Sequence, residues 1–270
     1  MGKSKIDWTD YSWNPVTGCS KVSAGCANCY AERHAKRFWG ERKFTDIVCH
    51  EDRLNYPFSI KQPARIFVNS MSDLFHEKVS YEFIEKVVRV IAKCPQHQFI
   101  VLTKRPEMLK SFFDAYPAPP NLIAGVSVED QRSADERVPL LMETNVRYRA
   151  ISAEPLLGHI SIMKLVARQN RILDWVIVGG ESGPGARVMD EGWALDLLTE
   201  CSRPLLGIPF YFKQWGEYNE NGVRVGKAAA GHLLNGRVIH EYPYTEGFIK
   251  MVESNLPRRI GVGLPKERTK

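Results

Sequence analysis

Residues 97–130, HQFIVLTKRPEMLKSFFDAYPAPPNLIAGVSVED, contain one complete repeat of the pattern that determines the fold. The apolar run 97–104 is typical of a buried strand, and residues 121–130 form a second run of the same kind. Between them, residues 106–116 place apolar side chains at helical spacing. A strand, a helix and a second strand in this order predict a βαβ unit with parallel strands.

The same alternation extends in both directions from this unit. Starting with the segment before Cys19, about six or seven strands are expected in all. Alternation of this kind predicts an α/β fold with a parallel sheet, and this number of strands suggests a partial or complete parallel (β/α)6–7 barrel. The remaining strands are expected at the start of 64–75 and at 146–156, 175–183 and 209–217, and the remaining helices at 81–94, 131–144 (with a proline interruption) and 192–204.

Two parts of the chain depart from this pattern. Residues 160–172 read as an insertion-like connection. Residues 217–270 contain the turn signals ENGV and LNGR between short β-like pieces, which predict a small hairpin appendage. We therefore expect a barrel domain over residues 1–216 and a C-terminal appendage with a basic tail over residues 217–270, packed on the barrel.

Polar residues gather where the predicted strands end. In β/α barrels and open parallel sheets, the C-terminal ends of the strands form the active face. Six strands that end in charged or amide groups are more than a simple exit into polar loops explains, so this edge is the expected site. These residues are Asn69, Ser70, Ser72, Asp73, Thr103, Lys104, Arg105, Ser127, Glu129, Asp130, Ser152, Glu154, Gly179, Gly180, Glu181, Ser182, Lys213, Gln214 and Trp215.

Composition and charge narrow the class of protein. No apolar run approaches the roughly 20 residues that span a bilayer, and the N-terminus lacks an apolar signal-peptide core, so we expect a cytoplasmic protein without a membrane partner. The net charge of +6 is compatible with a nucleic acid or nucleotide partner. Basic residues are concentrated at 30–43 and 258–270, which are either solvated surfaces or phosphate contacts.

Three cysteines fall within eleven residues of the stretch 13–38, WNPVTGCSKVSAGCANCYAERHAKRF. In a reducing compartment, clustered cysteines indicate metal ligands more than disulfides. Zinc in a structural site needs a fourth ligand, which His34 could supply. An iron–sulfur cluster held by Cys19, Cys26 and Cys29 would instead leave one iron open for a small molecule. Both metals remain open on these residues alone.

The cysteine loop resembles the cluster-binding loop of radical S-adenosylmethionine (SAM) enzymes, although its C-x6-C-x2-C spacing differs from their commonest C-x3-C-x2-C. The wider chain resembles a phage and bacterial family that is named for a three-cysteine motif and is distantly related to spore photoproduct lyase. The resemblance covers nearly the whole chain. It runs through the blocks DWTDYSWNPVTGC, GCANCYAER, FVNSMSDLFHE, VLTKRPE, GVSVEDQ, SAEPLLG, WVIVGGESGPGAR, FYFKQWGE and LLNGRVIHEYP.

This resemblance implies a barrel of radical SAM type with a [4Fe–4S] cluster on the three cysteines. SAM would bind the open iron, and an external electron donor would supply the electron that cleaves SAM to a 5′-deoxyadenosyl radical. Ser70, Lys104 and Ser127 match the strand-end positions that hold SAM in lyase-like relatives. Asn69 and Asp73 are expected to bind the methionine amine or the ribose.

The resemblance also implies a substrate pocket on the later strands. Carboxylates there suit an amine or the N–H edge of a base, Gln214 suits a base edge, and Tyr30 and Trp215 suit stacking on a ring. The glycine pair 179–180 would let the backbone approach adenine or SAM closely. The residues expected to face substrate are Tyr30, Arg105, Glu154, Glu181, Lys213, Gln214 and Trp215.

One position departs from the lyase-like relatives. Asn69 stands where those that repair DNA have a hydrogen-donor cysteine, which favours an isomerisation over lyase-type repair. Phage members of the family imply isomerisation of a glycyl adduct on thymine from N-linked to C-linked during DNA hypermodification, in the host cytoplasm, with Glu154 and Glu181 binding the glycyl ammonium. The alternatives are a radical SAM enzyme of tRNA modification or DNA repair, and a zinc-stabilised nucleic-acid-binding protein without redox chemistry.

Overall fold

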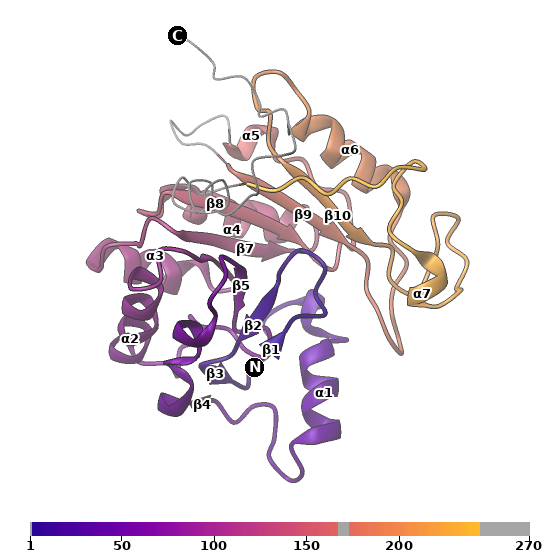
Figure 1. The fold of residues 1–270 in the computed structure, drawn as a ribbon. Coiled ribbons are helices and arrows are strands. Elements are labelled where there is room, and N and C mark those ends of the chain that lie inside the picture. Colours follow the sequence, from indigo (N-terminus) through magenta and orange to yellow (C-terminus); the bar gives the residue numbers. More distant parts are fainter. Residues whose placement is uncertain (1, 167–172, 244–270) are drawn as a thin grey trace.

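The computed structural model describes residues 2–166 and 173–243, and its centre is a curled sheet of eight strands (Figure 1). Seven of these strands run parallel in sequence order, and β1 adds to β2 in the antiparallel sense. The strands are β1 (Gly2–Lys3), β2 (Tyr11–Trp13), β5 (Arg65–Val68), β6 (Gln98–Thr103), β7 (Leu122–Val128), β8 (Tyr148–Ala153), β9 (Trp175–Gly179) and β10 (Phe210–Gln214).

The sheet confirms the predicted partial parallel barrel. Its strand order ends at β1 on one side and at β10 on the other, so within the described residues the barrel stays open. Strands β5 to β8 pair with their neighbours in parallel, as expected for βαβ units. A second sheet, of two short antiparallel strands, β3 (Val16–Thr17) and β4 (Val48–Cys49), lies within the β2–β5 connection.

Local sequence signals explain where the main helices begin. Ser80 caps α2 by accepting a hydrogen bond from the Phe83 N–H, and Pro106 occupies the first turn of α3. Asp130 and Ser133 form a reciprocal capping box at the start of α4. The helices are α1 (Tyr30–Phe38), α2 (Tyr81–Ala92), α3 (Pro106–Ala115), α4 (Gln131–Glu143), α5 (Met163–Val166), α6 (Glu191–Cys201) and α7 (Lys227–Ala230), with 3-10 turns at Ala24–Cys26, Glu51–Arg53 and Tyr56–Ser59.

The predicted proline interruption of the 131–144 helix is wrong, because α4 runs through Pro139 as one helix. The buried side chains of this helix, among them Val138 and Leu141, pack in the main core. Packing of this apolar face against the sheet stabilises the helix and outweighs the loss of one backbone hydrogen bond at the proline.

The inner face of the sheet carries its own apolar cluster, separate from the larger core under the helices. Trp8 lies at its centre, with its ring 4.7 Å from Phe67 and 5.7 Å from Trp175 in edge-to-face contacts. Ile100, Ile123, Ala150, Ile177 and Tyr211 complete it. Because side chains alternate along a strand, inward positions two or four residues further along carry the polar residues of the site, such as Asn69 after Phe67 and Lys104 after Ile100.

The described part of the appendage, residues 217–243, packs against the last strands. Both predicted turns are present, with antiparallel bridges from Tyr218 to Arg224 and from Leu234 to Arg237. Residues 244–270, including the predicted basic tail at 258–270, lie outside the described residues, as do residues 167–172 of the predicted insertion. No helix in the described ranges has the length and apolar character needed to cross a membrane.

Phe67→Ala should destabilise the protein by about 3–5 kcal/mol, because it leaves a cavity beneath Trp8 in the inner cluster. Phe38→Ala is the matched control, since this ring is 59% exposed and its loss should cost less than about 0.5 kcal/mol. Urea unfolding followed by tryptophan fluorescence measures both. Equal midpoints for the two variants would contradict a packed inner cluster.

Candidate functional site

A cavity of about 380 Å³ lies at the C-terminal ends of the strands, beneath the cysteine loop. It brings together residues from the loop, from α1, from strands β5, β6, β7, β8 and β10, and from the segment that follows β9. Nearly all the residues predicted from the sequence line it: Cys19, Cys26, Cys29, Tyr30, Asn69, Ser70, Asp73, Lys104, Arg105, Ser127, Glu154, Glu181, Lys213 and Gln214. Trp215 is not among the lining residues.

The cysteine loop is fixed at its first cysteine by backbone contacts. The Cys19 N–H donates to the Phe44 carbonyl at 2.8 Å. Gly18 has a φ of +96°, and a Cβ there would lie 2.3 Å from the Asp46 carbonyl oxygen, so only glycine fits. Cys26 ends the 3-10 turn and Cys29 is the N-cap residue of α1. The loop geometry therefore presents all three thiols to one cavity.

The electrostatic surroundings of the thiols differ. Burial, and then the charge of Asp73, raise the pKa of Cys19 to about 12. Burial also acts to raise the pKa of Cys26, but the Lys104 ammonium and hydrogen bonds from the 22–23 backbone lower it below its ordinary value. Lys104 therefore favours the thiolate form of Cys26, which is the form that binds metals.

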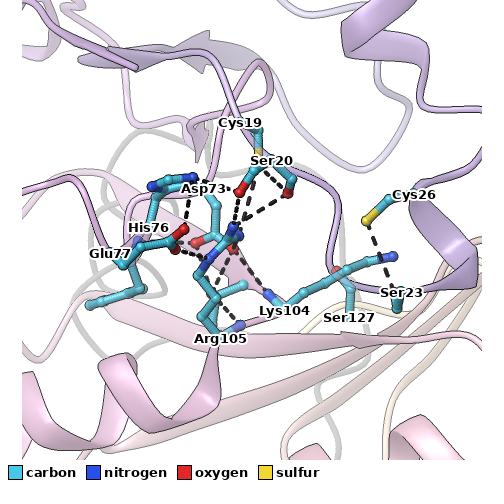
Figure 2. A network of polar contacts seen from close by, with 12 residues as sticks. Cys19, Ser20, Ser23, Cys26, Asp73, His76, Glu77, Lys104, Arg105 and Ser127 are labelled. Atoms are coloured by element: carbon cyan, nitrogen blue, oxygen red, sulfur yellow. Dashed lines mark hydrogen bonds and ion pairs between the residues drawn. The ribbon is translucent and has the colours of Figure 1, made fainter. Parts of the chain in front are cut away.

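Arg105 connects the cysteine loop to two carboxylates (Figure 2). Its Nη1 lies 3.1 Å from Asp73 Oδ2, its Nε lies 2.8 Å from Glu77 Oε2, and its Nη2 donates to Ser20 Oγ at 2.8 Å. Nη1 also lies 3.8 Å from Cys19 Sγ. Arg105 was predicted to face substrate, but its guanidinium is committed to these protein groups.

Asp73 likewise does not match its predicted role at the methionine amine or the ribose. Its carboxylate accepts from Thr103 Oγ1 at 2.7 and 2.9 Å, from the Phe75 N–H at 3.0 Å and from the Lys104 N–H at 3.1 Å, besides Arg105. It is 6% exposed. The carboxylate is fully engaged, so Asp73 ties β6 to the loop after β5.

Asn69 retains an unused donor. Its backbone is in the left-handed region, with a φ of 63°, and its Oδ1 accepts from the Val16 N–H at 3.1 Å. Its Nδ2 is buried and has no hydrogen-bond partner among the described residues. The neighbouring Ser70 donates to Asn14 Oδ1 at 3.2 Å, and the Tyr30 hydroxyl donates to the Ser70 carbonyl at 2.5 Å. This corner of the cavity is built from polar groups that suit a polar ligand.

Lys104 directly follows β6, and Ser127 lies near the end of the neighbouring strand β7, at the strand ends where both were predicted. Lys104 Nζ is 3.4 Å from Glu129 Oε2, and the same carboxylate receives Arg137 Nη1 at 3.0 Å. A Cβ on Gly25 would lie 2.5 Å from Lys104 Nζ. The glycine before Cys26 thus lets the cysteine loop approach the lysine closely.

Glu154 and Lys213 form an ion pair across the far side of the cavity. Lys213 Nζ lies 2.6 Å from Glu154 Oε1, and Ser152 donates to Glu154 Oε2 at 3.1 Å. Gln214 is 7% exposed, and its amide nitrogen donates to the Gly180 carbonyl at 2.8 Å, while its Oε1 has no partner in the described part of the chain. These groups lie where the sequence placed them.

Glu181 does not present a free carboxylate for a substrate ammonium. It is 5% exposed and binds Arg187 through both oxygens, at 2.6 and 2.9 Å. It also accepts from Asn28 Nδ2, at 3.0 Å, while Arg187 Nη2 donates to the Ala24 carbonyl at 3.0 Å. Glu181 is thus not available as predicted, because its carboxylate holds the cysteine loop from the β9 side.

Two further residues tie the same segment to the loop. Asn28 Nδ2 donates to the Gly185 carbonyl at 2.7 Å, and Arg33 Nη2 donates to the Ser182 carbonyl at 2.7 Å. Sequence reasoning missed Asn28, Arg33 and Arg187. The signal was present in the run GGESGPGAR, whose glycines at 183 and 185 leave room for these side chains.

Ligand contacts were also predicted for Trp215 and for the glycine pair 179–180. Trp215 is 2% exposed in the main core, and its indole N–H donates to the Leu233 carbonyl at 2.7 Å, so it does not stack on a ligand. A Cβ on Gly180 would lie 1.9 Å from the Trp215 carbonyl oxygen. Gly180 therefore permits close contact with the end of β10. It also lines the cavity, so the approach of its backbone to adenine or SAM stays a prediction.

The donor set suits a metal cluster with one open position. Three thiols on one loop face a cavity that contains a cation beside Cys26 and the Nδ2 of Asn69, which has no partner in the described part of the chain. Among the described residues, no three His, Cys, Asp or Glu side chains converge closely enough to hold a single metal ion. A [4Fe–4S] cluster spreads its thiolate ligands over different irons, and so three sulfurs around a cavity fit it chemically.

Fold and site together define a class, namely a partial parallel β/α barrel with three cysteines on one loop over the C-terminal ends of its strands. The chain belongs to the family described as "Protein of unknown function (DUF5131)", whose model matches residues 3–243.

Among solved structures, the chain is similar to a spore photoproduct lyase variant with bound AdoMet and dinucleoside spore photoproduct, at 13% identity and a TM-score of 0.44, covering 66% of this chain and 57% of that one. A second variant of spore photoproduct lyase has 12% identity and a TM-score of 0.48, covering 94% of this chain and 76% of that one. A comparison with curated proteins found no match.

Glu181→Gln should loosen the cysteine loop, because an amide cannot hold Arg187 and Asn28 as the carboxylate does. Alkylation of Cys26 and Cys29 under native conditions, followed by peptide mass spectrometry, should be severalfold faster than in the unmodified protein. Glu136→Gln, which removes a surface pair with Arg132, is the matched control and should leave the rates unchanged. Unchanged rates in both variants would argue against this clamp.

Proposed function

We propose that this protein is a radical SAM enzyme that acts on a nucleobase in nucleic acid. The observation that carries the proposal is the single cavity shared by Cys19, Cys26 and Cys29 and the polar ends of six consecutive parallel strands. Active sites of parallel β/α folds lie at this end of the strands. Three thiols without a fourth in the same loop suit a centre that must keep one position open for a second molecule.

In this proposal, Cys19, Cys26 and Cys29 hold a [4Fe–4S] cluster, and SAM binds beside it. Together these two groups supply a 5′-deoxyadenosyl radical, with an electron from an external donor. Lys104 places a cation where the carboxylate of SAM would be favoured, and Ser70 and Ser127 supply hydroxyl groups on either side. Asn69 contributes its Nδ2 donor, which no other group in the described residues engages. The protein's own part is to orient and enclose these groups.

The opposite side of the cavity is proposed to receive the substrate. Tyr30 is 50% exposed and lines the cavity, so its ring is available for stacking on a base. Glu154, Lys213 and Gln214 supply polar groups for a base edge. A second cavity of about 400 Å³ shares Lys213, Gln214 and Lys227 with the first and offers room for flanking nucleotides.

Phosphate contacts are proposed for the basic segment 30–43. On α1 the side chains of Lys36 and Arg37 are exposed, next to the 59% exposed ring of Phe38. Exposed cations beside an aromatic side chain suit a nucleic acid backbone, whose binding should weaken as salt increases. The exposed face of α1 is therefore the proposed entry surface for the nucleic acid.

The narrower proposal is isomerisation of a glycyl adduct on thymine, from the N-linked to the C-linked form, during phage DNA hypermodification. Apart from the three loop cysteines, no thiol lies among the described residues that line the cavity. An isomerisation that regenerates its radical needs no thiol as a hydrogen donor. With Glu181 engaged by Arg187, Glu154 is the carboxylate proposed to meet the glycyl ammonium, in exchange for Lys213.

Two alternatives remain distinct from this proposal. A radical SAM enzyme of tRNA modification or DNA repair would use the same cofactor side and a different substrate. A zinc-stabilised nucleic-acid-binding protein would use the three thiols, with His34 as a fourth ligand, to hold the loop. The metal content separates the last from the first two.

Anaerobic purification should yield a brown protein with about four irons per chain. It should form 5′-deoxyadenosine from SAM on reduction. Cys29→Ala should lose both properties, whereas Cys49→Ala should keep them, because Cys49 is an exposed thiol outside the cavity. Metal analysis and chromatography of the products check this. A colourless protein with one zinc per chain would overturn the radical SAM assignment.

DNA that carries glycyl-thymine tests the narrower proposal. Incubation with reconstituted protein, SAM and a reductant should convert the adduct to an isomer of the same mass that elutes separately from the starting nucleoside. Glu154→Gln should slow this conversion while 5′-deoxyadenosine formation from SAM persists. An active cluster without any conversion would reject the isomerase and retain the broader class.

A further inference from the structure

The guanidinium of Arg105 makes contacts that the proposed nucleobase chemistry does not use. It is 7% exposed and contacts the first cysteine, the residue after it and two carboxylates from the loop that follows β5. Its planar fork uses a different nitrogen for Ser20, for Glu77 and for the pair formed by Asp73 and Cys19. A fixed cation therefore lies beside the Cys19 sulfur (Figure 2).

The cations beside the first two cysteines come from consecutive residues. Lys104 and Arg105 follow the end of β6, and their side chains diverge toward Cys26 and Cys19 respectively (Figure 2). Arg105 differs from Lys104 in that an N–H points at sulfur, since its Nη1 lies within hydrogen-bond reach of Cys19 Sγ, at 3.8 Å. Asp73, 6% exposed, and Glu77 hold the guanidinium in this orientation.

We propose that Arg105 is a positioning residue that makes the centre bound through Cys19 easier to reduce. This inference rests on the proposed function. Hydrogen bonds to cysteine sulfur and local charge are established determinants of the potential of an iron–sulfur centre. Arginine keeps its charge at all relevant pH values, so its effect does not depend on a titration.

The electron balance of the step is simple. A one-electron reductant gives one electron to the oxidised [4Fe–4S]2+ centre, which becomes [4Fe–4S]+, and no covalent bond forms or breaks. The added negative charge is delocalised onto the sulfur ligands. The Arg105 guanidinium stabilises this charge, while the carboxylates of Asp73 and Glu77 oppose it.

The test is an anaerobic redox titration of the reconstituted full chain without SAM, followed by electron paramagnetic resonance. Arg105→Gln should lower the equilibrium constant for reduction of the cluster about tenfold. For one electron, this corresponds to a reduction potential that is about 59 mV lower. Arg105→Lys should restore most of the potential because it keeps the charge. Arg132→Gln, which removes an exposed cation paired with Glu136 on α4, should leave the potential unchanged.

Glu77→Gln is a second variant for the redox titration, in case the Arg105→Gln protein cannot hold a cluster. The Glu77 side chain is 57% exposed, so this variant should fold, and loss of its charge should shift the potential upward. A cluster-loaded Arg105→Gln protein with an unchanged potential, or a Glu77→Gln protein with an unchanged or lower one, would overturn the inference. Failure of the unmodified protein to bind iron would instead overturn the proposed function.

Discussion

The alternation of side chains along parallel strands is the constraint on which the cavity depends. On the inner face, Ile100 of β6 packs in the apolar cluster, and Lys104 reaches the cavity four residues later. On β8, Ala150 packs in the same cluster, and Ser152 and Glu154, two and four residues later, line the cavity. Along each strand, apolar inward residues at the bottom of the cavity are thus followed by polar residues that line its sides. The in-register pairing of neighbouring strands aligns these two layers. The apolar layer excludes water beneath the polar groups.

The cysteine loop crosses this opening and is held from both sides by carboxylate–arginine contacts. On the β5–β6 side, Arg105 joins Asp73 to Ser20, and on the β9 side, Arg187 joins Glu181 to Ala24. In each case the carboxylate is buried and its partner reaches a loop carbonyl or hydroxyl. Such contacts restrict the loop in position and direction, because a charged hydrogen bond loses most of its value when its geometry changes.

Sequence periodicity was sufficient for the parallel sheet and for the location of the site, because both follow from which residues alternate and where strands end. It could not assign partners. Asp73 and Glu181 lie in the segments that follow β5 and β9, at the edge that the pattern predicts. Thr103 and Arg187, which occupy their carboxylates, are recognisable only in three dimensions. The prediction for Trp215 failed because the pairing register shifts between Phe212 and Gln214. Lys213 and Gln214 both line the cavity, and the next side chain, Trp215, lies in the core.

Once these internal pairs are set aside, the cavity is asymmetric. The side formed by β5 to β7 retains hydrogen-bond donors: Asn69 Nδ2 has no partner within residues 2–166 and 173–243, and Lys104 shares Glu129 with Arg137. The side formed by β8 to β10 contributes the Glu154 carboxylate, which is paired with Lys213, and Gln214 Oε1, which has no partner among the described residues. A ligand that presents a carboxylate is favoured next to Cys26, and one that presents an ammonium or N–H group is favoured opposite. This division matches a cofactor with an anionic end on one side and an amine-bearing or base substrate on the other, which is why the two halves of the proposed function can be tested separately.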